Sequence, residues 1–158
     1  VGTIEESMNT KTVIKKYKGM DAKKVTKGTG SGELKVSIHM DYGIYKKTYG
    51  MNLGDLEDGV VSYGQNSVHP HFGITSKVLD EDDNVKFKAY PNCTVEDGMA
   101  RKITNGSEEV AEIDMTVSVM PDETGQGLYE ALESELGEEL KGKWMTEFTP
   151  ELARKKEL

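Results

Sequence analysis

The chain has 158 residues and a formal net charge of −8, from 28 acidic and 20 basic residues. Hydrophobic residues make up 35% and charged residues 30%, so the composition favours one folded domain with a thin apolar core over a disordered chain. A globally acidic chain is poorly suited to tight capture of nucleic acid, which requires clustered Lys and Arg at the phosphates. No apolar run approaches the roughly 20 residues that cross a bilayer, so we expect no membrane anchor.

The ends and the single cysteine bear on the compartment. No basic segment followed by an apolar one opens the chain, so we expect an unsecreted protein. Cys93 is the only cysteine and cannot form an internal disulfide, which agrees with a reducing compartment. The chain begins at Val1 and not at Met, which agrees with a missing upstream segment.

The first forty residues alternate in a way that predicts strands. Residues 2–8 and 12–18 are two strand candidates. The region 19–32 is rich in Lys, Thr and Gly, and we expect an extended arm or loop with at most one short strand, at 22–27. The clearest strand is 32–40, because its apolar and polar residues alternate strictly: Leu34, Val36, Ile38 and Met40 share one face, and Glu33, Lys35, Ser37 and His39 share the other.

A short helix is predicted over residues 41–51, between early strands. Asp41 is suited to cap its first turn, and Tyr42, Tyr45 and Tyr49 follow at spacings of three and four residues. Aromatic residues are enriched at the cores of protein interfaces, but a stripe at helical spacing is equally typical of an ordinary core. Both interpretations of the three tyrosines stay open.

A β-hairpin is predicted between residues 69 and 90, after a short strand at 59–64. Asp80, Asp82 and Asn84 at its tip resemble the start of a calcium loop. Such a loop also needs Gly at its sixth position and Glu at its twelfth, where this chain has Val85 and Pro91. The pattern therefore favours a solvated acidic turn over a cation site.

The second half adds two more strands and a helix. We expect a strand at 94–104, a tight turn at Asn105-Gly106 and the best strand of the chain at 108–120. An amphipathic helix is predicted at 128–140 and a last strand at 143–149. Six to eight strands and two helices indicate a mainly β fold, a β-sandwich or barrel with one or two flanking α-helices in a single domain, 1–158, of which the helical part 126–158 matches least well.

Charge is distributed unevenly along the chain. The segment from Lys11 to Lys27 carries many lysines and only one acid, Asp21, whereas the segment from Glu130 to Glu139 carries only acids. Opposed patches of this kind suit contacts between copies of the same chain.

Residues with catalytic or metal-binding chemistry are few. His39, His69, His71 and Cys93 are the soft ligands, and their spacing matches none of the familiar zinc motifs. The glycines of KGTGSGE precede a strand, whereas a phosphate-binding loop follows a strand and opens a helix. We therefore expect no enzymatic activity, no metal and no cofactor, and rank a hydrolase using Cys93 or His71 well behind the other hypotheses.

The order of these segments resembles one protein family. It runs from GTIEESMNT through the Lys/Gly-rich arm, GELKVSIHMDYGIYKKTYGM and DGVVSYGQN to the HPHFGITSKVLDEDDNVKFKAYPNCTVEDGMARK hairpin and the EIDMTVSVMPDE strand. Over about residues 2 to 125 this order is similar to that of the major tail proteins, or tail tube proteins, of long-tailed bacteriophages and prophages. The resemblance rests on strand order and carries no catalytic signature.

The resemblance implies a structural subunit of the virion. Family members form rings of six that stack into the hollow tube through which double-stranded DNA leaves the capsid, with strands shared between neighbouring subunits. The implied partners are other copies of the chain, further tail proteins and DNA in transient, non-specific passage. The expected contacts between subunits involve Lys23, Lys24, Lys27, Tyr42, Tyr45 and Tyr49, and the residues expected to face the lumen are Glu33, Glu112, Asp114 and Thr116.

A monomeric β-sandwich binding module, such as an adhesin or carbohydrate binder, is the alternative. Such modules usually present an exposed aromatic platform, and Trp144 is the only tryptophan of this chain. The tail tube subunit is therefore the preferred hypothesis.

Overall fold

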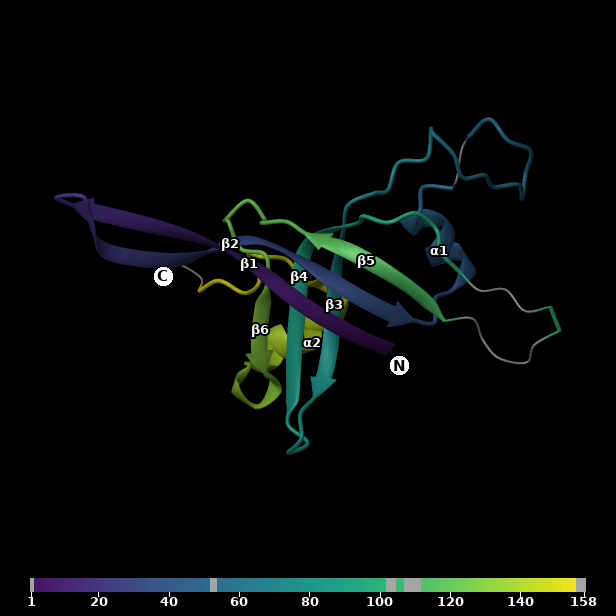
Figure 1. Cartoon of the computed structure of the whole chain (residues 1–158). Coiled ribbons are helices and arrows are strands. Elements are labelled where there is room, and N and C mark those ends of the chain that lie inside the picture. Colours follow the sequence, from purple (N-terminus) through teal and green to yellow (C-terminus); the bar gives the residue numbers. More distant parts are fainter. Residues whose placement is uncertain (1, 52–53, 102–104, 107–111, 156–158) are drawn as a thin grey trace. The chain divides into compact units, whose positions relative to one another are not determined.

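The computed structural model describes residues 2–51, 54–101, 105–106 and 112–155 (Figure 1). Two compact units interleave along the chain: the first comprises residues 1–7, 33–72 and 93–118, and the second comprises 8–32, 73–92 and 119–158. The elements in chain order are β1 (Gly2–Tyr17), β2 (Met20–Ile38), α1 (Tyr42–Thr48), β3 (Phe72–Leu79), β4 (Val85–Val95), β5 (Ile113–Val119), β6 (Tyr129–Leu132), η1 (Glu133–Glu135) and α2 (Glu138–Glu147).

The six strands form one antiparallel sheet in the order β1-β2-β5-β4-β3, and β6 pairs with β4 beside this path. The prediction of a mainly β fold with six to eight strands and flanking helices is confirmed. The predicted hairpin is formed by β3 and β4, which are neighbours in the sheet.

Strands β1 and β2 form a hairpin that is longer than the sequence pattern predicted. The two strand candidates at 2–8 and 12–18 are one continuous strand, and the region 19–32, expected as an extended arm or loop, belongs to β2 after its first residue. Lys18 and Gly19 both adopt positive φ, 49° and 78°, as tight two-residue hairpin turns require. The Thr and Lys residues of 20–29 therefore pair with β1, and the glycines do not interrupt the strand.

The first unit has the buried face that alternation predicted. In β2, Leu34 and Val36 are buried, and in β5 the buried residues are Ile113, Met115, Val117 and, at its end, Val119 of the second unit. Helix α1 begins as predicted, because the Asp41 carboxylate accepts a hydrogen bond of 2.8 Å from the Gly43 amide.

Two predicted strands of the first unit are wrong. Residues 59–64 form no strand, although the Ser62 amide donates to the Met51 carbonyl at 3.3 Å. Strand β4 ends at Val95, so 96–101 is irregular, and 102–104 lie outside the described residues. Asn105 and Gly106 form the predicted turn, and β5 begins at Ile113, with 108–111 also outside the described part of the chain.

The predicted helix at 128–140 is also wrong, as is the strand at 143–149. Residues 129–132 form β6, which pairs with β4 so that Phe87 lies opposite Ala131. Helix α2 begins only after Gly137, which occupies its N-cap, and it continues to Glu147. Pairing with a neighbouring strand outweighs the helical pattern of this segment, since tertiary contacts override weak local preferences.

The second unit has an aromatic core between its strands and α2. Phe87, Ala89 and Trp144 are buried together, and Phe148 and Tyr129 pack against them. The Trp144 ring lies 6.0 Å from the Phe87 ring and 4.7 Å from the Phe148 ring, measured between centroids. The indole N–H donates to the Lys88 carbonyl at 3.1 Å, so the buried tryptophan has its polar atom satisfied.

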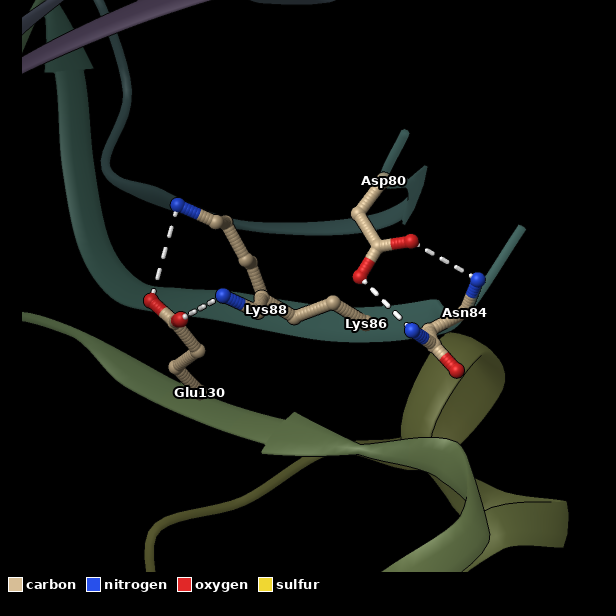
Figure 2. Close-up of polar contacts among 5 residues, drawn as sticks. All are labelled: Asp80, Asn84, Lys86, Lys88 and Glu130. Atoms are coloured by element: carbon tan, nitrogen blue, oxygen red, sulfur yellow. Dashed lines mark hydrogen bonds and ion pairs between the residues drawn. The ribbon is translucent and has the colours of Figure 1, made fainter. Parts of the chain in front are cut away.

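A carboxylate joins β6 to β4 on the exposed side (Figure 2). Glu130 lies 2.7 Å from the Lys86 ammonium and 3.5 Å from that of Lys88. The hydrogen bond from Lys86, assisted by the charge of Lys88, lowers the pKa of Glu130. The short strand β6 is therefore held by charge pairs as well as by its backbone.

Candidate assembly surface

The part of the β1–β2 hairpin from residue 9 to residue 29, here called the arm, is exposed on both faces. Every residue in this range is exposed except Val25, which is half-buried. The arm also exposes large apolar side chains, with Tyr17 67% and Met20 71% accessible beside Val13 and Ile14. A two-stranded hairpin alone is only marginally stable in water, and large exposed apolar side chains are unusual on such a segment.

The arm is strongly basic. It carries seven lysines and one acid, Asp21, although the whole chain has a net charge of −8. Within the described residues, no ion pair involves any of these lysines, and only Lys18 makes a recorded contact, with its ammonium 5.5 Å from the Tyr17 ring centre. Lys23, Lys24 and Lys27, expected at a contact between subunits, are therefore exposed and available to a partner.

The base of the arm is fixed by close backbone packing within the second unit. Gly30 has a φ of +77°, and a Cβ there would lie 2.6 Å from the Gly125 carbonyl oxygen. A Cβ on Gly127 would collide with the Gly30 carbonyl. The two glycines let these backbone segments touch, so the arm leaves the second unit from a defined anchor.

The three tyrosines of the predicted interface separate into two groups. Tyr42 is exposed, with the Lys46 ammonium 4.8 Å from its ring centre. Tyr45 and Tyr49 are buried within the first unit, and burial raises the pKa of Tyr49 to about 12. The placement of Tyr45 and Tyr49 at a subunit contact is therefore wrong, because side chains this buried belong to the core, the other interpretation of the tyrosine pattern.

Tyr49 and His69 belong to an aromatic cluster that closes the loop after α1. Their rings meet edge to face with centroids 5.3 Å apart. His69 Nδ1 lies 2.8 Å from the Val95 carbonyl oxygen, so Nδ1 donates, and in the neutral ring Nε2 accepts from the Tyr63 hydroxyl at 2.9 Å. His69 therefore fastens the loop to the end of β4, a structural role.

Cys93 lies in an environment that disfavours its reactive thiolate form. Cys93 is fully buried, and desolvation raises the pKa of its thiol to about 12. A nucleophilic cysteine needs a lowered pKa and access to substrate, so this environment disfavours a hydrolase built on Cys93. Among the described residues, no three His, Cys, Asp or Glu side chains are grouped as metal ligands.

The residues expected to face a lumen lie on the polar face of the strands. Glu33, Glu112 and Asp114 are exposed and Thr116 is half-buried, opposite the apolar face of β2 and β5. Asp114 accepts a hydrogen bond from Ser37, and both carboxylate oxygens of Asp97 accept from the Thr116 amide at 3.0 to 3.1 Å. A shallow groove of about 360 Å³ on this face has three acids and one lysine among its lining residues: Glu5, Lys35, Asp97 and Asp114.

Residues 79–84, here called the acidic turn, connect β3 and β4. The Asp80 carboxylate accepts from the amides of Asp82 and Asn84 at 2.9 and 2.8 Å and from the Asn84 side chain at 3.1 Å. Figure 2 shows the bonds that join Asp80 and Asn84. These bonds, chiefly those from Asn84, lower the pKa of Asp80. The ligand pattern that resembled a calcium loop is thus used to close a turn, in which Asp83 adopts positive φ.

Sequence reasoning missed two parts of this surface. The exposed apolar residues of the arm were assigned to separate strands, although the Lys18-Gly19 pair between two alternating segments is a turn signal. The sequence interpretation favoured a solvated acidic turn over a cation site at these residues and did not consider the turn as a binding surface, although four consecutive acids make it the most acidic tip of a hairpin.

No described helix is both long enough and apolar enough to span a membrane. Neither a protein-family model nor a curated protein sequence matches this chain.

Proposed function

We propose that the chain is a structural subunit that assembles with copies of itself into stacked rings of six, the tail tube of a long-tailed phage. The arm is the observation that carries the proposal. A 16-residue strand, β1, pairs with the 19-residue β2 to build it, and both faces of the arm lack a covering layer in the single chain. Burial against neighbouring copies would stabilise it.

The outer edge of β1 supports the same proposal. β1 is the last strand in the sheet order, so within the described residues one edge has no neighbouring strand. Long exposed edges pair readily with other chains, and closing a sheet across subunits removes them. Sharing strands around a ring is the arrangement that gives every such edge a partner.

The acidic polar face suits the wall of a DNA conduit. Glu33, Glu112 and Asp114 project from the face opposite the apolar core, where like charge repels phosphates and keeps DNA from adhering. The proposal thus places the chain in the virion, with other tail proteins as partners and DNA in transient passage.

A monomeric carbohydrate-binding module is less well supported. Trp144, the only tryptophan, is 2% exposed and packed on Phe87, so it is not part of an exposed aromatic platform. The tryptophan belongs to the buried core of the second unit.

Negative-stain electron microscopy of the concentrated protein tests the proposal. We expect rings and tubes of constant diameter. A matched variant replaces residues 13–25 by Asn-Gly, which joins Thr12 to Thr26, whose hydroxyl oxygens lie 3.4 Å apart across the hairpin. This variant should fold and form no tubes. A wild-type protein that stays monomeric in sedimentation at high concentration and physiological salt would overturn the proposal.

A further inference from the structure

We infer that the arm of one copy docks on the acidic turn of another copy, a contact that rests on the proposed self-assembly and names its partner surface. A receptor for the basic arm needs acidic side chains that have no ion partner within their own chain. The sequence alone offered a different acidic patch, from Glu130 to Glu139.

Three of the five acids of that patch have ion partners within the chain, whereas Glu135 and Glu138 are in no ion pair among the described residues. Glu130 pairs with Lys86 and Lys88, Glu133 lies 3.6 Å from the Lys141 ammonium, and Glu139 lies 3.7 Å from that of Lys143. An approaching lysine would have to compete with these existing partners. The segment is therefore a weak receptor for the arm.

The acidic turn is different. Glu81, Asp82 and Asp83 are exposed, and none of their carboxylates has an ion pair within the part of the chain that the structure describes. Asp80 uses its oxygens to hold the turn, and these bonds fix the backbone that carries the three neighbouring carboxylates. The turn is thus a preorganised anionic tip, which lowers the cost of ordering it on binding.

Apolar surface makes the match more specific than charge alone. Beside the acids, β3 exposes Val78 and Leu79, the latter 65% accessible. The arm pairs its lysines with exposed Tyr17 and Met20 at its own end. Each surface thus combines exposed apolar side chains with charges of one sign, and the signs are opposite, as complementary interfaces require.

The two surfaces are different parts of the same chain, so a copy whose arm docks on a second copy can offer its own acidic turn to a third. Such a heterologous contact generates closed rings or open-ended stacks, whereas a reciprocal exchange of arms between two copies would stop at a dimer. Every copy then donates one arm and offers one acidic turn.

Charge reversal on each side tests the inference. The arm variant carries Lys23→Glu and Lys24→Glu, the turn variant carries Glu81→Lys and Asp82→Lys, and Asp80 is kept because it holds the turn. A control with the same charge change as the turn variant carries Glu147→Lys and Glu151→Lys, both exposed and outside the two surfaces. Circular dichroism and the unfolding midpoint check that each variant folds.

Sedimentation velocity at about 0.1 M and 1 M salt measures the association of each protein. We expect self-association of the arm variant and of the turn variant to weaken about tenfold or more, because close charge pairs across interfaces couple at least this strongly. The control should associate as the wild type does, and high salt should weaken the wild type. An equimolar mixture of the two variants should recover association, since the reversed arm of one matches the reversed turn of the other.

The outcomes separate this inference from the proposed function. Wild-type tubes with an unaffected turn variant, or a mixture that does not recover, would overturn the docking and leave the subunit role standing. If the mixture recovers association but the wild type forms no tubes, the docking is supported and the proposed tail tube function is overturned. Binding of a labelled DNA duplex that is lost in the arm variant, with association of copies unchanged, would assign the arm to nucleic acid and overturn the docking.

Discussion

The arm and the aromatic core of the second unit are built by opposite means. Around Trp144, three elements contribute side chains that bury one another, and the indole N–H and the nearby charges have partners inside the chain. In the arm, two strands are joined by backbone pairing and by exposed hydroxyl contacts such as that between Thr12 and Thr26, while lysines and large apolar side chains face outward on both sides. One region is buried within a single copy, and the other is exposed.

This difference separates residues that stabilise the single chain from residues that are free to contact a second one. Burial of apolar area stabilises a single chain by about 25 cal/mol per Å², so substitutions in the core act on folding. Exposed residues contribute little to folding, whereas the same residues contribute to binding when a partner covers them. Substitutions in the two regions should therefore change different measurements.

The largest effect is expected at the core. Replacing Trp144 by Ala removes the contacts with Phe87 and Phe148 and leaves a cavity, so the free energy of unfolding should fall by about 3–5 kcal/mol. Denaturant unfolding of the monomer measures the loss. Met145→Ala is the control, because this neighbour in α2 is exposed and should change stability by under about 0.5 kcal/mol. Equal losses of unfolding free energy in the two variants would show that burial of Trp144 does not decide the stability of this unit.

A smaller effect is expected at the loop that follows β5. Burial opposes ionisation of Asp122, but hydrogen bonds from the Tyr129 hydroxyl at 2.6 Å, from Thr124 and from the Gln126 amide outweigh it and lower its pKa to about 2. Asp122→Asn replaces one acceptor oxygen by a donor and should destabilise the protein by about 1–3 kcal/mol at pH 7.

The sign of the pH dependence follows from the lowered pKa of Asp122. The carboxylate contributes its stability above the ordinary pKa of an aspartate, about 3.9, and this contribution disappears as the pH falls toward 2. The difference in unfolding free energy between wild type and Asp122→Asn should therefore shrink between about pH 4 and pH 2. A difference that stays constant over this range would show that the ionised form is not what holds the loop.

The contrast between the regions also explains which elements the sequence could predict. Alternation in 32–40 and 113–119 places apolar side chains on one face, and burial of Leu34, Val36 and Val117 confirms it, because a half-buried strand leaves a period of two. Asp41 at the start of α1 is likewise a local signal, since the cap bonds within two residues. Features decided by neighbours in sequence were predictable.

Features that depend on residues distant in the sequence could not be predicted from local patterns. Residues 129–132 have an amphipathic helical pattern, but they pair with 86–89, on a strand forty or more positions earlier in the chain. Trp144 packs on Phe87, which lies far from it in the sequence, and its segment forms the second half of α2 where a final strand was predicted. The spacing of Tyr42, Tyr45 and Tyr49 fitted interface and core equally, and only the folded arrangement decided between them.

The smallest effect on folding is expected in the arm, where stability and association of copies should change separately. Tyr17→Ala and Met20→Ala remove exposed side chains, so the unfolding free energy of the monomer should change by less than about 0.5 kcal/mol. Association of copies should weaken in both variants, because these side chains are the apolar part of the proposed contact. Unfolding at low protein concentration and sedimentation at high concentration, on the same preparations, give the two numbers. A loss of stability as large as that of Trp144→Ala would mean that the arm is already packed within one copy, and the distinction between a buried core and an exposed arm would no longer hold.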